Sequence, residues 1–356
     1  MKKTLLLLAA LATTFGAAIA QKPVKVEMQA LQSFLQQQSE SGATNASALG
    51  ISNLNDPTTW PGVKSSNGRI TEIDWKGKHL AGQLSLTGFN NLTKVDLSDN
   101  KLSSLVLSAN PNLQEVNTAR NSLTNLVVGS CPQLQVLRAY RNHLTNLDVS
   151  DVPFLTRLNV ASNHITSLDI SNAMNLVTLN CTNNGMEQLN INGCQSLVHV
   201  YAGYNNLSDM QMVGLANLQT LNLTNNKILK LYLQDYPKLS TLLCSDNHMT
   251  ELGLNNLPAL ADITASYNDL TQFQVNNCPN LQFVNVSWND LGYLSLSGYN
   301  ALQRVNASNN QLLSINVSFD PQLQYLNIAN NVNINAVNRE GDTMLNQIVG
   351  VWDEID

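Results

Sequence analysis

Hydrophobic positions recur along this chain with a period of 21 residues between Asn91 and Asp342. In the first unit, residues 91–111, positions 2, 5, 7, 12, 15 and 17 are apolar, and residues 217–237 repeat this set. Positions 5 and 7 alternate with polar positions 4, 6 and 8, and positions 15 and 17 alternate with positions 14, 16 and 18. The alternation predicts two short strands in each unit, each with one buried face, and leaves no room for a helix of ordinary length. A fixed period of this size predicts a solenoid in which each unit packs on its two neighbours.

Asparagine fills position 10 of every unit. An amide at the turn after the first strand can pair with backbone groups of the adjoining coil, where interior N–H and C=O groups need partners. We therefore interpret the column as a buried structural ladder without a catalytic role. Its members are Asn100, Asn121, Asn142, Asn163, Asn184, Asn205, Asn226, Asn247, Asn268, Asn289, Asn310 and Asn331.

The segment from Leu92 to Leu102 has the pattern L-x-x-L-x-L-x-x-N-x-L, which resembles the leucine-rich repeat. The doubling of L-x-x-L-x-L within one 21-residue unit is similar to a short bacterial subclass, common in Bacteroidetes surface and secreted proteins. In class of function the chain is similar to the internalin group. The resemblance implies a mainly β solenoid of about twelve rungs with two narrow parallel sheets. It also implies a scaffold that binds a protein or a glycan, with no enzymatic activity and no cofactor.

The two ends of the chain lie outside the repeat. Residues 1–20 carry Lys2 and Lys3, an apolar run and a small-x-small ending at Ala20, which predicts a secretory signal peptide. We therefore expect a secreted, periplasmic or cell-surface protein after cleavage near Ala20. Residues 343–356 are expected to close the last coil as a C-terminal cap.

Residues 21–90 are predicted to form an N-terminal cap and a degenerate first repeat ahead of the repeats at 91–342. An apolar stripe from Val26 to Leu35 predicts a helix. The segment Trp60-Pro61-Gly62-Val63 resembles the cap of plant-type leucine-rich repeats, although the paired cysteines of that cap are absent before Cys131. We expect packing alone to hold the cap, which a solenoid needs in order to cover its end coil.

Composition and motifs exclude several classes of function. The formal net charge is −6 and no basic stripe is present, which disfavours nucleic-acid binding. The N-terminal apolar run is too short for a membrane span, so no transmembrane segment is predicted. Neither H-E-x-x-H, nor G-x-S-x-G, nor a P-loop occurs, so no catalytic or metal-binding residue is predicted. We predict a monomer.

The five cysteines fall in two columns, Cys181 and Cys244 at position 7 and the other three at position 20. Neighbours within a column are three or four coils apart, about 15–20 Å at the spacing of paired strands, while a disulfide needs Cα atoms within about 7 Å. We therefore predict five free, buried thiols: Cys131, Cys181, Cys194, Cys244 and Cys278.

Positions 4, 6, 8, 9 and 11 are predicted to form one exposed face. Units at residues 112–174 place arginine and tyrosine there as a positive patch, and later units place aromatic and acidic residues there. Arginine with aromatic residues is the composition favoured at interfaces, although scattered solubilising charge is the alternative. The candidate binding residues are Arg120, Arg138, Tyr140, Arg141, Arg157, Tyr204, Tyr267 and Trp288.

Two smaller features of this face are also considered as sites. His143 and His164 share position 11 in adjacent units, but no third metal ligand joins them. Asp269 and Asp290 are also adjacent at position 11, and carboxylates about 5 Å apart can share Ca²⁺. The oxygen ligands are too few to predict such a site, and the question stays open.

The leading hypothesis is a secreted, non-enzymatic leucine-rich repeat protein that binds a protein or glycan through this face. The alternative is a structural or adhesive cell-surface component, in which the stack of coils matters more than any single site.

Overall fold

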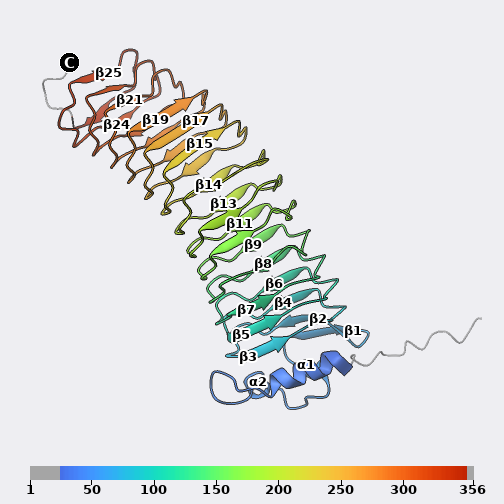
Figure 1. Cartoon of the computed structure of the whole chain (residues 1–356). Helices are drawn as coiled ribbons and strands as arrows, with labels where there is room; N and C mark the ends of the chain where they lie inside the picture. The colour runs from blue at the N-terminus through green and yellow to red at the C-terminus, as the bar shows by residue number, and fades with distance from the viewer. Residues whose placement is uncertain (1–24, 351–356) are drawn as a thin grey trace, which may run out of the picture.

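The structure, a computed structural model, describes residues 25–350. It is a long, gently curved rod with short helices at its N-terminal end (Figure 1). About thirteen coils with a 21-residue spacing form a mainly β solenoid, which confirms the predicted fold class. The predicted signal peptide at residues 1–20, and Val351 and Trp352 of the predicted C-terminal cap, lie outside the described residues.

One sheet of fifteen strands follows the rod along what we call the first side. β1 and β2 are antiparallel, and the later pairs are parallel. Successive strands join residues 21 positions apart, as Leu179 pairs with Val200 and Val200 with Leu221. The strands are β1 (Val63–Ser66), β2 (Arg69–Asp74), β4 (Lys94–Asp96), β6 (Glu115–Asn117), β8 (Val136–Arg138), β9 (Arg157–Asn159), β11 (Thr178–Asn180), β13 (His199–Tyr201), β14 (Thr220–Asn222), β16 (Thr241–Leu243), β18 (Asp262–Thr264), β20 (Phe283–Asn285), β22 (Arg304–Asn306), β24 (Tyr325–Asn327) and β26 (Gln347–Val349).

The second side of the coil is not one sheet, as the sequence led us to expect, but four short parallel sheets. Between these sheets, neighbouring second strands are not paired with each other. At the first break the inward residues Leu147 and Val149 nevertheless stay buried. The sheets contain β3 (Ala81–Ser85), β5 (Lys101–Val106) and β7 (Asn125–Val127); β10 (Ser167–Asp169) and β12 (Gln188–Asn190); β15 (Lys230–Gln234), β17 (Glu251–Asn255) and β19 (Gln272–Asn276); and β21 (Tyr293–Ser295), β23 (Ser314–Asn316) and β25 (Ala336–Asn338).

The apolar positions of the repeat fill a continuous core between the two sides. All six apolar residues of the unit at 91–111 have no exposed surface. Burying one leucine side chain stabilises the fold by about 1.5–3 kcal/mol, so the periodic pattern supplies most of the driving force for coiling. The five cysteines are free and buried in this core, as predicted.

The asparagine column is a ladder of hydrogen bonds between coils. Asn142 Nδ2 donates to the carbonyl oxygens of Ala139 at 3.1 Å and Thr118 at 3.0 Å, and its Oδ1 accepts from Leu123 N at 3.0 Å. One amide thus pairs three backbone groups in two coils, and the same pattern recurs along the column. The column is buried apart from Asn184, which is half-buried beside Gly185.

The N-terminal segment covers the first coil. The predicted helix is present as α1 (Lys25–Leu35), which contacts β3 and α2 (Asn45–Ala48); a 3-10 turn, η1 (Pro57–Thr59), precedes β1. Phe34 of α1 stacks on Trp75 with ring centroids 6.0 Å apart. An ion pair between Arg69 and Glu27, 2.7 Å long and largely buried, ties α1 to β2. Packing and this ion pair hold the segment without a disulfide.

Candidate interaction surface

The predicted binding face consists of two adjoining surfaces of the first side. The side chains at positions 4, 6 and 8 lie on or beside the strands of the long sheet, and we call them the sheet surface. The side chains at positions 9 and 11 lie at the turn that follows, and we call them the rim. Arg157, Arg138 and Tyr140 belong to the sheet surface. The rim holds the other five candidates: Arg120, Arg141, Tyr204, Tyr267 and Trp288.

The positive patch predicted for the sheet surface is partly neutralised. Arg138 donates to Glu115 at 2.6 Å, and Lys94 lies 3.2 Å from the same carboxylate. The hydrogen bond from Arg138, together with Lys94, lowers the pKa of Glu115, so this carboxylate stays ionised and cancels charge. Arg157 is exposed, with no carboxylate oxygen within 4.0 Å among residues 25–350. The sheet surface is therefore less basic than its arginines suggest.

The rim is set by a left-handed backbone at position 9. All twelve position-9 residues have positive φ between 54° and 60°, including Tyr204 and Tyr267. Asparagine and aspartate adopt this conformation readily, whereas for other side chains it costs roughly 1–2 kcal/mol. Seven units carry asparagine, aspartate or serine at position 9, and the other five carry the large residues of the candidate list.

The conformational energy of the left-handed backbone indicates that those five large side chains have a function. Local strain that persists in a fold marks functional positions when nothing in the packing explains it. Tyr204, Tyr267 and Trp288 are each half exposed, at 55, 53 and 50 %. Their rings bury little of the core, so packing does not repay the strain. The structure thus gives these residues a physical distinction that the sequence did not carry.

Tyr267 and Trp288 form an exposed aromatic pair on the rim. Their ring centroids lie 5.4 Å apart with an angle of 9° between the planes. Asp246 precedes Tyr267 in the position-9 column, and Asp269 and Asp290 occupy position 11 of the same two units. This end of the rim therefore combines aromatic faces with carboxylates, a chemistry that suits cationic groups.

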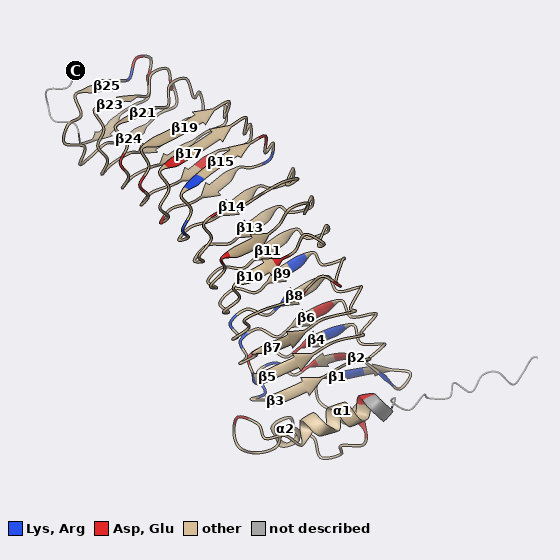
Figure 2. Cartoon of the chain, viewed as in Figure 1, with Lys and Arg blue, Asp and Glu red and all other residues tan. Residues whose placement is uncertain are grey.

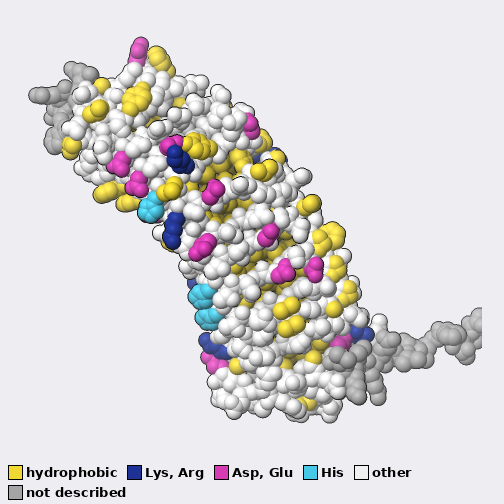
Figure 3. Space-filling view, viewed as in Figure 1, with side chains coloured by type: hydrophobic (Ala, Val, Ile, Leu, Met, Phe, Trp, Pro, Cys, Tyr) yellow, Lys and Arg dark blue, Asp and Glu magenta, His cyan; other side chains and the backbone are white. Residues whose placement is uncertain are grey.

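The basic end of the rim lies toward the N-terminus, as the blue segments along the turn edge in Figure 2 show. Arg120 Nη1 lies 3.3 Å from Asp99 Oδ1 of the preceding unit. Arg141 is exposed and, among the described residues, has no carboxylate oxygen within 4.0 Å. Next to it, His143 and His164 stack with centroids 5.7 Å apart. Figure 3 shows the histidine, basic, acidic and hydrophobic side chains of the rim along one edge of the rod.

The rim offers no metal site in the described part of the chain. Within residues 25–350, no group of three or more His, Cys, Asp or Glu side chains could hold an ion. Asp269 lies 3.6 Å from His248, and Asp290 accepts from Gln311 at 2.7 Å. These carboxylates have protein partners instead of facing a common centre.

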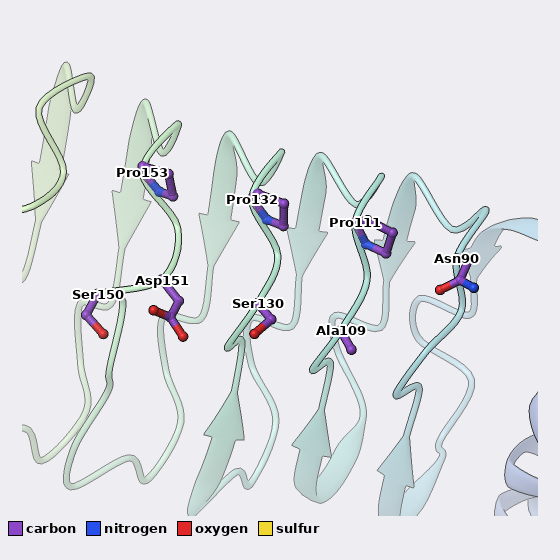
Figure 4. Close-up of a pocket in the computed structure, with 8 residues that line it drawn as sticks. All are labelled: Asn90, Ala109, Pro111, Ser130, Pro132, Ser150, Asp151 and Pro153. Carbon is purple, nitrogen blue, oxygen red and sulfur yellow. The ribbon is translucent and has the colours of Figure 1, made fainter.

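Two of the hollows that lie away from the rim exceed 700 Å³, and the sequence did not indicate either one. A shallow pocket of about 710 Å³ runs across the turns that end the second strands, with Pro111, Pro132 and Pro153 in successive coils (Figure 4). A cavity of about 770 Å³ lies at the break between β19 and β21, lined by Phe273, Tyr293 and other residues. Prolines after a strand are typical of turns and do not by themselves indicate a pocket, and a break in the sheet has no local sequence pattern.

The comparisons with known proteins agree on the fold. The sequence matches no protein-family model and no curated protein. The functional domain of InlJ from Listeria monocytogenes is 28% identical with a TM-score of 0.55, over 78% of this chain and 54% of that chain. YopM from Yersinia pestis is 21% identical with a TM-score of 0.58, over 79% and 88%. The leucine-rich repeat domain of APL1B is 22% identical with a TM-score of 0.51, over 64% and 70%.

These structures identify the fold as a leucine-rich repeat solenoid. This chain spans about half the length of the InlJ domain, which includes a cysteine ladder. Here no two cysteines of one column lie in adjacent units. Among residues 25–350, no helix is long and apolar enough to cross a membrane.

Proposed function

We propose that this chain is a secreted, non-enzymatic scaffold that binds a protein partner through the sheet surface and the rim. The observation that carries the proposal is the set of large side chains at left-handed position 9. Arg120, Arg141, Tyr204, Tyr267 and Trp288 occupy a conformation that disfavours them, and they remain exposed. Exposed aromatic and arginine side chains are the residues that dominate binding energy at protein interfaces.

A protein is favoured over a glycan as the partner because the rim is long and carries opposite charge at its two ends. Its candidates extend from Arg120 to Trp288, eight coils or about 40 Å at the spacing of paired strands. Arg138, Tyr140 and Arg157 adjoin the basic end on the sheet surface. A binding surface of this length suits a folded protein better than a short sugar chain. Adhesion at the cell surface would follow if that partner is exposed on another cell.

The test is a comparison of aromatic substitutions on two surfaces. Tyr267→Ala/Trp288→Ala removes the rim pair, and Tyr232→Ala/Tyr293→Ala removes two equally exposed rings from the second side. Partners are captured from surface extracts on immobilised wild-type chain, identified, and re-measured as purified proteins by surface plasmon resonance.

We expect the rim variant to lose more than about 30-fold in affinity, because hot-spot truncations cost about 2 kcal/mol or more. The second-side variant should bind within about twofold of wild type. Equal losses in both variants, or a loss confined to the second-side variant, would show that the rim is not the binding surface. A glycan array probed with the same variants reports whether the ligand is a sugar instead.

A further inference from the structure

The large residues of the rim are placed symmetrically along the rod. Tyr204 belongs to the sixth unit of the repeat, residues 196–216. Arg141 lies three units before it and Tyr267 three units after it. Arg120 lies four units before it and Trp288 four units after it. The five position-9 residues that are not asparagine, aspartate or serine are therefore mirrored about Tyr204, with cations at one end and aromatic rings at the other.

The charges of the rim are also distributed about Tyr204, with opposite signs on its two sides. Units two to five, which lie one to four units before Tyr204, carry Arg120 and Arg141 and no carboxylate at positions 9 and 11. Units seven to ten carry three carboxylates against a single lysine: Asp246, Asp269, Asp290 and Lys227. Counted over the same four units on either side of Tyr204, the rim thus carries net charges of +2 and −2, with histidine neutral. In Figure 2 basic segments predominate on this edge toward the N-terminal end of the rod, and acidic segments predominate toward the C-terminal end.

We propose that the partner of the rim is a second copy of this chain, packed antiparallel with its two-fold axis at Tyr204. A two-fold interface uses the same patch on both copies, so each contact occurs twice. Arg141 of one copy faces Tyr267 of the other, and Arg120 faces Trp288, which places guanidinium groups against aromatic faces. His143 faces Asp269, and the two Tyr204 rings meet at the axis. This inference rests on the proposed function and names its partner; it replaces the monomer expected from the sequence.

The length of the rim allows an estimate of the affinity of the dimer. A strip of nine units, about 40 Å long, buries on the order of 1,000 Å² over both copies, which is the lower end for specific interfaces. We therefore expect a reversible dimer with a dissociation constant on the order of micromolar. Because charged contacts are exposed at both ends, the dimer should weaken as salt rises.

Charge reversal provides a decisive test. Arg120→Glu/Arg141→Glu makes the basic end acidic, and Asp269→Arg/Asp290→Arg makes the acidic end basic. Each variant alone places like charges opposite one another at both contacts and should be monomeric by sedimentation velocity at about 50 µM, where wild type is largely dimeric. Mixed one to one, the variants regain opposite charges at one contact and keep the native pairing at the other, so the dimer should return.

The control is Asp148→Arg/Asp169→Arg, which reverses two exposed carboxylates on the second side and should leave the dimer intact. Circular dichroism verifies that every variant is folded. Wild type that stays monomeric at about 100 µM, or a mixture that sediments as monomer, would overturn the proposal.

A single cysteine at the axis tests the orientation. Tyr204→Cys brings two identical thiols together across the axis, while the five native thiols are buried. Mild oxidation should give a covalent dimer of this variant within minutes. Asn183→Cys and Asn225→Cys, one unit to either side, should cross-link efficiently only when mixed, because each faces the other. Efficient cross-linking of Asn183→Cys alone would indicate a different axis and overturn the antiparallel register.

The outcomes separate this inference from the proposed function. If wild type is monomeric but Tyr267→Ala/Trp288→Ala still loses a captured partner, only self-pairing is wrong. If the dimer forms and no other protein binds at the rim, self-association is the function of the rim and binding of a different protein is excluded there.

Discussion

The two sides of the coil show what regularity in one column of side chains does for a solenoid. On the first side, position 10 is asparagine in every unit, and fifteen strands form one sheet. On the second side, position 20 follows the second strand in the same way, but its residue changes from Asn110 to Cys131, Val152 and Tyr299. Here the strands form four separate sheets.

Several residues at position 20 bond to the backbone carbonyl 24 residues before them, through side chains of different length. Asn110 Nδ2 donates to Leu86 O at 2.9 Å, as the asparagines of position 10 do with the preceding unit. Cys131 Sγ lies 3.0 Å from Leu107 O, the equivalent carbonyl one coil later. Strand pairing requires a constant spacing near 4.8 Å, which side chains of unequal reach do not impose.

Tyrosine at position 20 accompanies one of the breaks of the second side. The Tyr299 hydroxyl donates to Val275 O at 2.6 Å, across the break between β19 and β21 where the cavity of about 770 Å³ lies. Because the ring is much longer than an asparagine side chain, it holds the two second strands apart. Val152 has no donor, and the strand of its unit is also lost. Leu257 also has no donor, yet β17 of its unit pairs with both β15 and β19, so a uniform position-20 column is one contribution to a continuous sheet and not the only one.

Removing one amide from the regular column should have the largest effect. Asn163 donates to Val160 O at 2.9 Å and Ala139 O at 3.0 Å and accepts from Leu144 N at 3.0 Å. Asn163→Ala leaves these buried backbone groups without hydrogen-bond partners. We expect it to lower the free energy of unfolding by on the order of 3 kcal/mol. Urea denaturation followed by circular dichroism measures it.

The matched control is Asn146→Ala, an exposed asparagine of the neighbouring unit, which should change stability by less than about 0.5 kcal/mol. Similar midpoints for the two variants would mean that the ladder contributes little and that the core alone maintains the first sheet.

The sequence predicted the first side well because periodicity records burial directly. The inward residues, the asparagine ladder and the free thiols all follow from which positions are apolar and how far apart equal positions lie. The breaks of the second side could not be predicted in this way. They depend on the reach of single side chains such as Tyr299, and the apolar pattern at positions 15 and 17 continues through them.

The candidate surface was predicted in its residues but not in its geometry. Counting positions placed Tyr204 and Trp288 on an exposed face, and both are exposed. The asparagine and aspartate of position 9 are compatible with a left-handed backbone, but the units with tyrosine or tryptophan there give no such indication, because these residues rarely adopt it. The ion pair between Arg138 and Glu115 joins two neighbouring units, and it cannot be predicted from which positions are exposed.

A buried carboxylate offers a smaller, pH-dependent test of the second side. Asp320 occupies position 20; its Oδ1 accepts from Tyr299 N at 2.6 Å, and its Oδ2 is buried without a partner. Burial raises the pKa of Asp320 to about 7. Since the folded-state pKa lies above the unfolded value near 3.9, this group stabilises the fold least when it is ionised, so its contribution falls as pH rises from about 4 to about 7.

We therefore expect Asp320→Asn to raise the free energy of unfolding by about 1–3 kcal/mol at pH 8 and to have little effect at pH 4. Asn110, which donates from the same column to Leu107 O and Leu86 O, shows that an amide fits there. Denaturant midpoints of wild type and variant between pH 4 and pH 8 measure the difference. A constant difference across this range would show that Asp320 does not titrate in it.

The smallest expected effect comes from extending the regular column into the second side. Cys131 lies one coil after Asn110 and contacts the carbonyl of Leu107, which an asparagine amide would bond more strongly. Cys131→Asn should add at most about 1 kcal/mol to the free energy of unfolding, the net worth of one hydrogen bond. Cys181→Asn is the matched comparison, because its thiol lies at fully buried position 7, where burial raises the pKa of the thiol to about 12. There an amide lacks the turn carbonyls of position 20, so we expect a clear loss of stability. If Cys131→Asn stabilises the fold and Cys181→Asn destabilises it, position 20 is equivalent to position 10. If both substitutions destabilise the fold, the amide ladder is restricted to the first side.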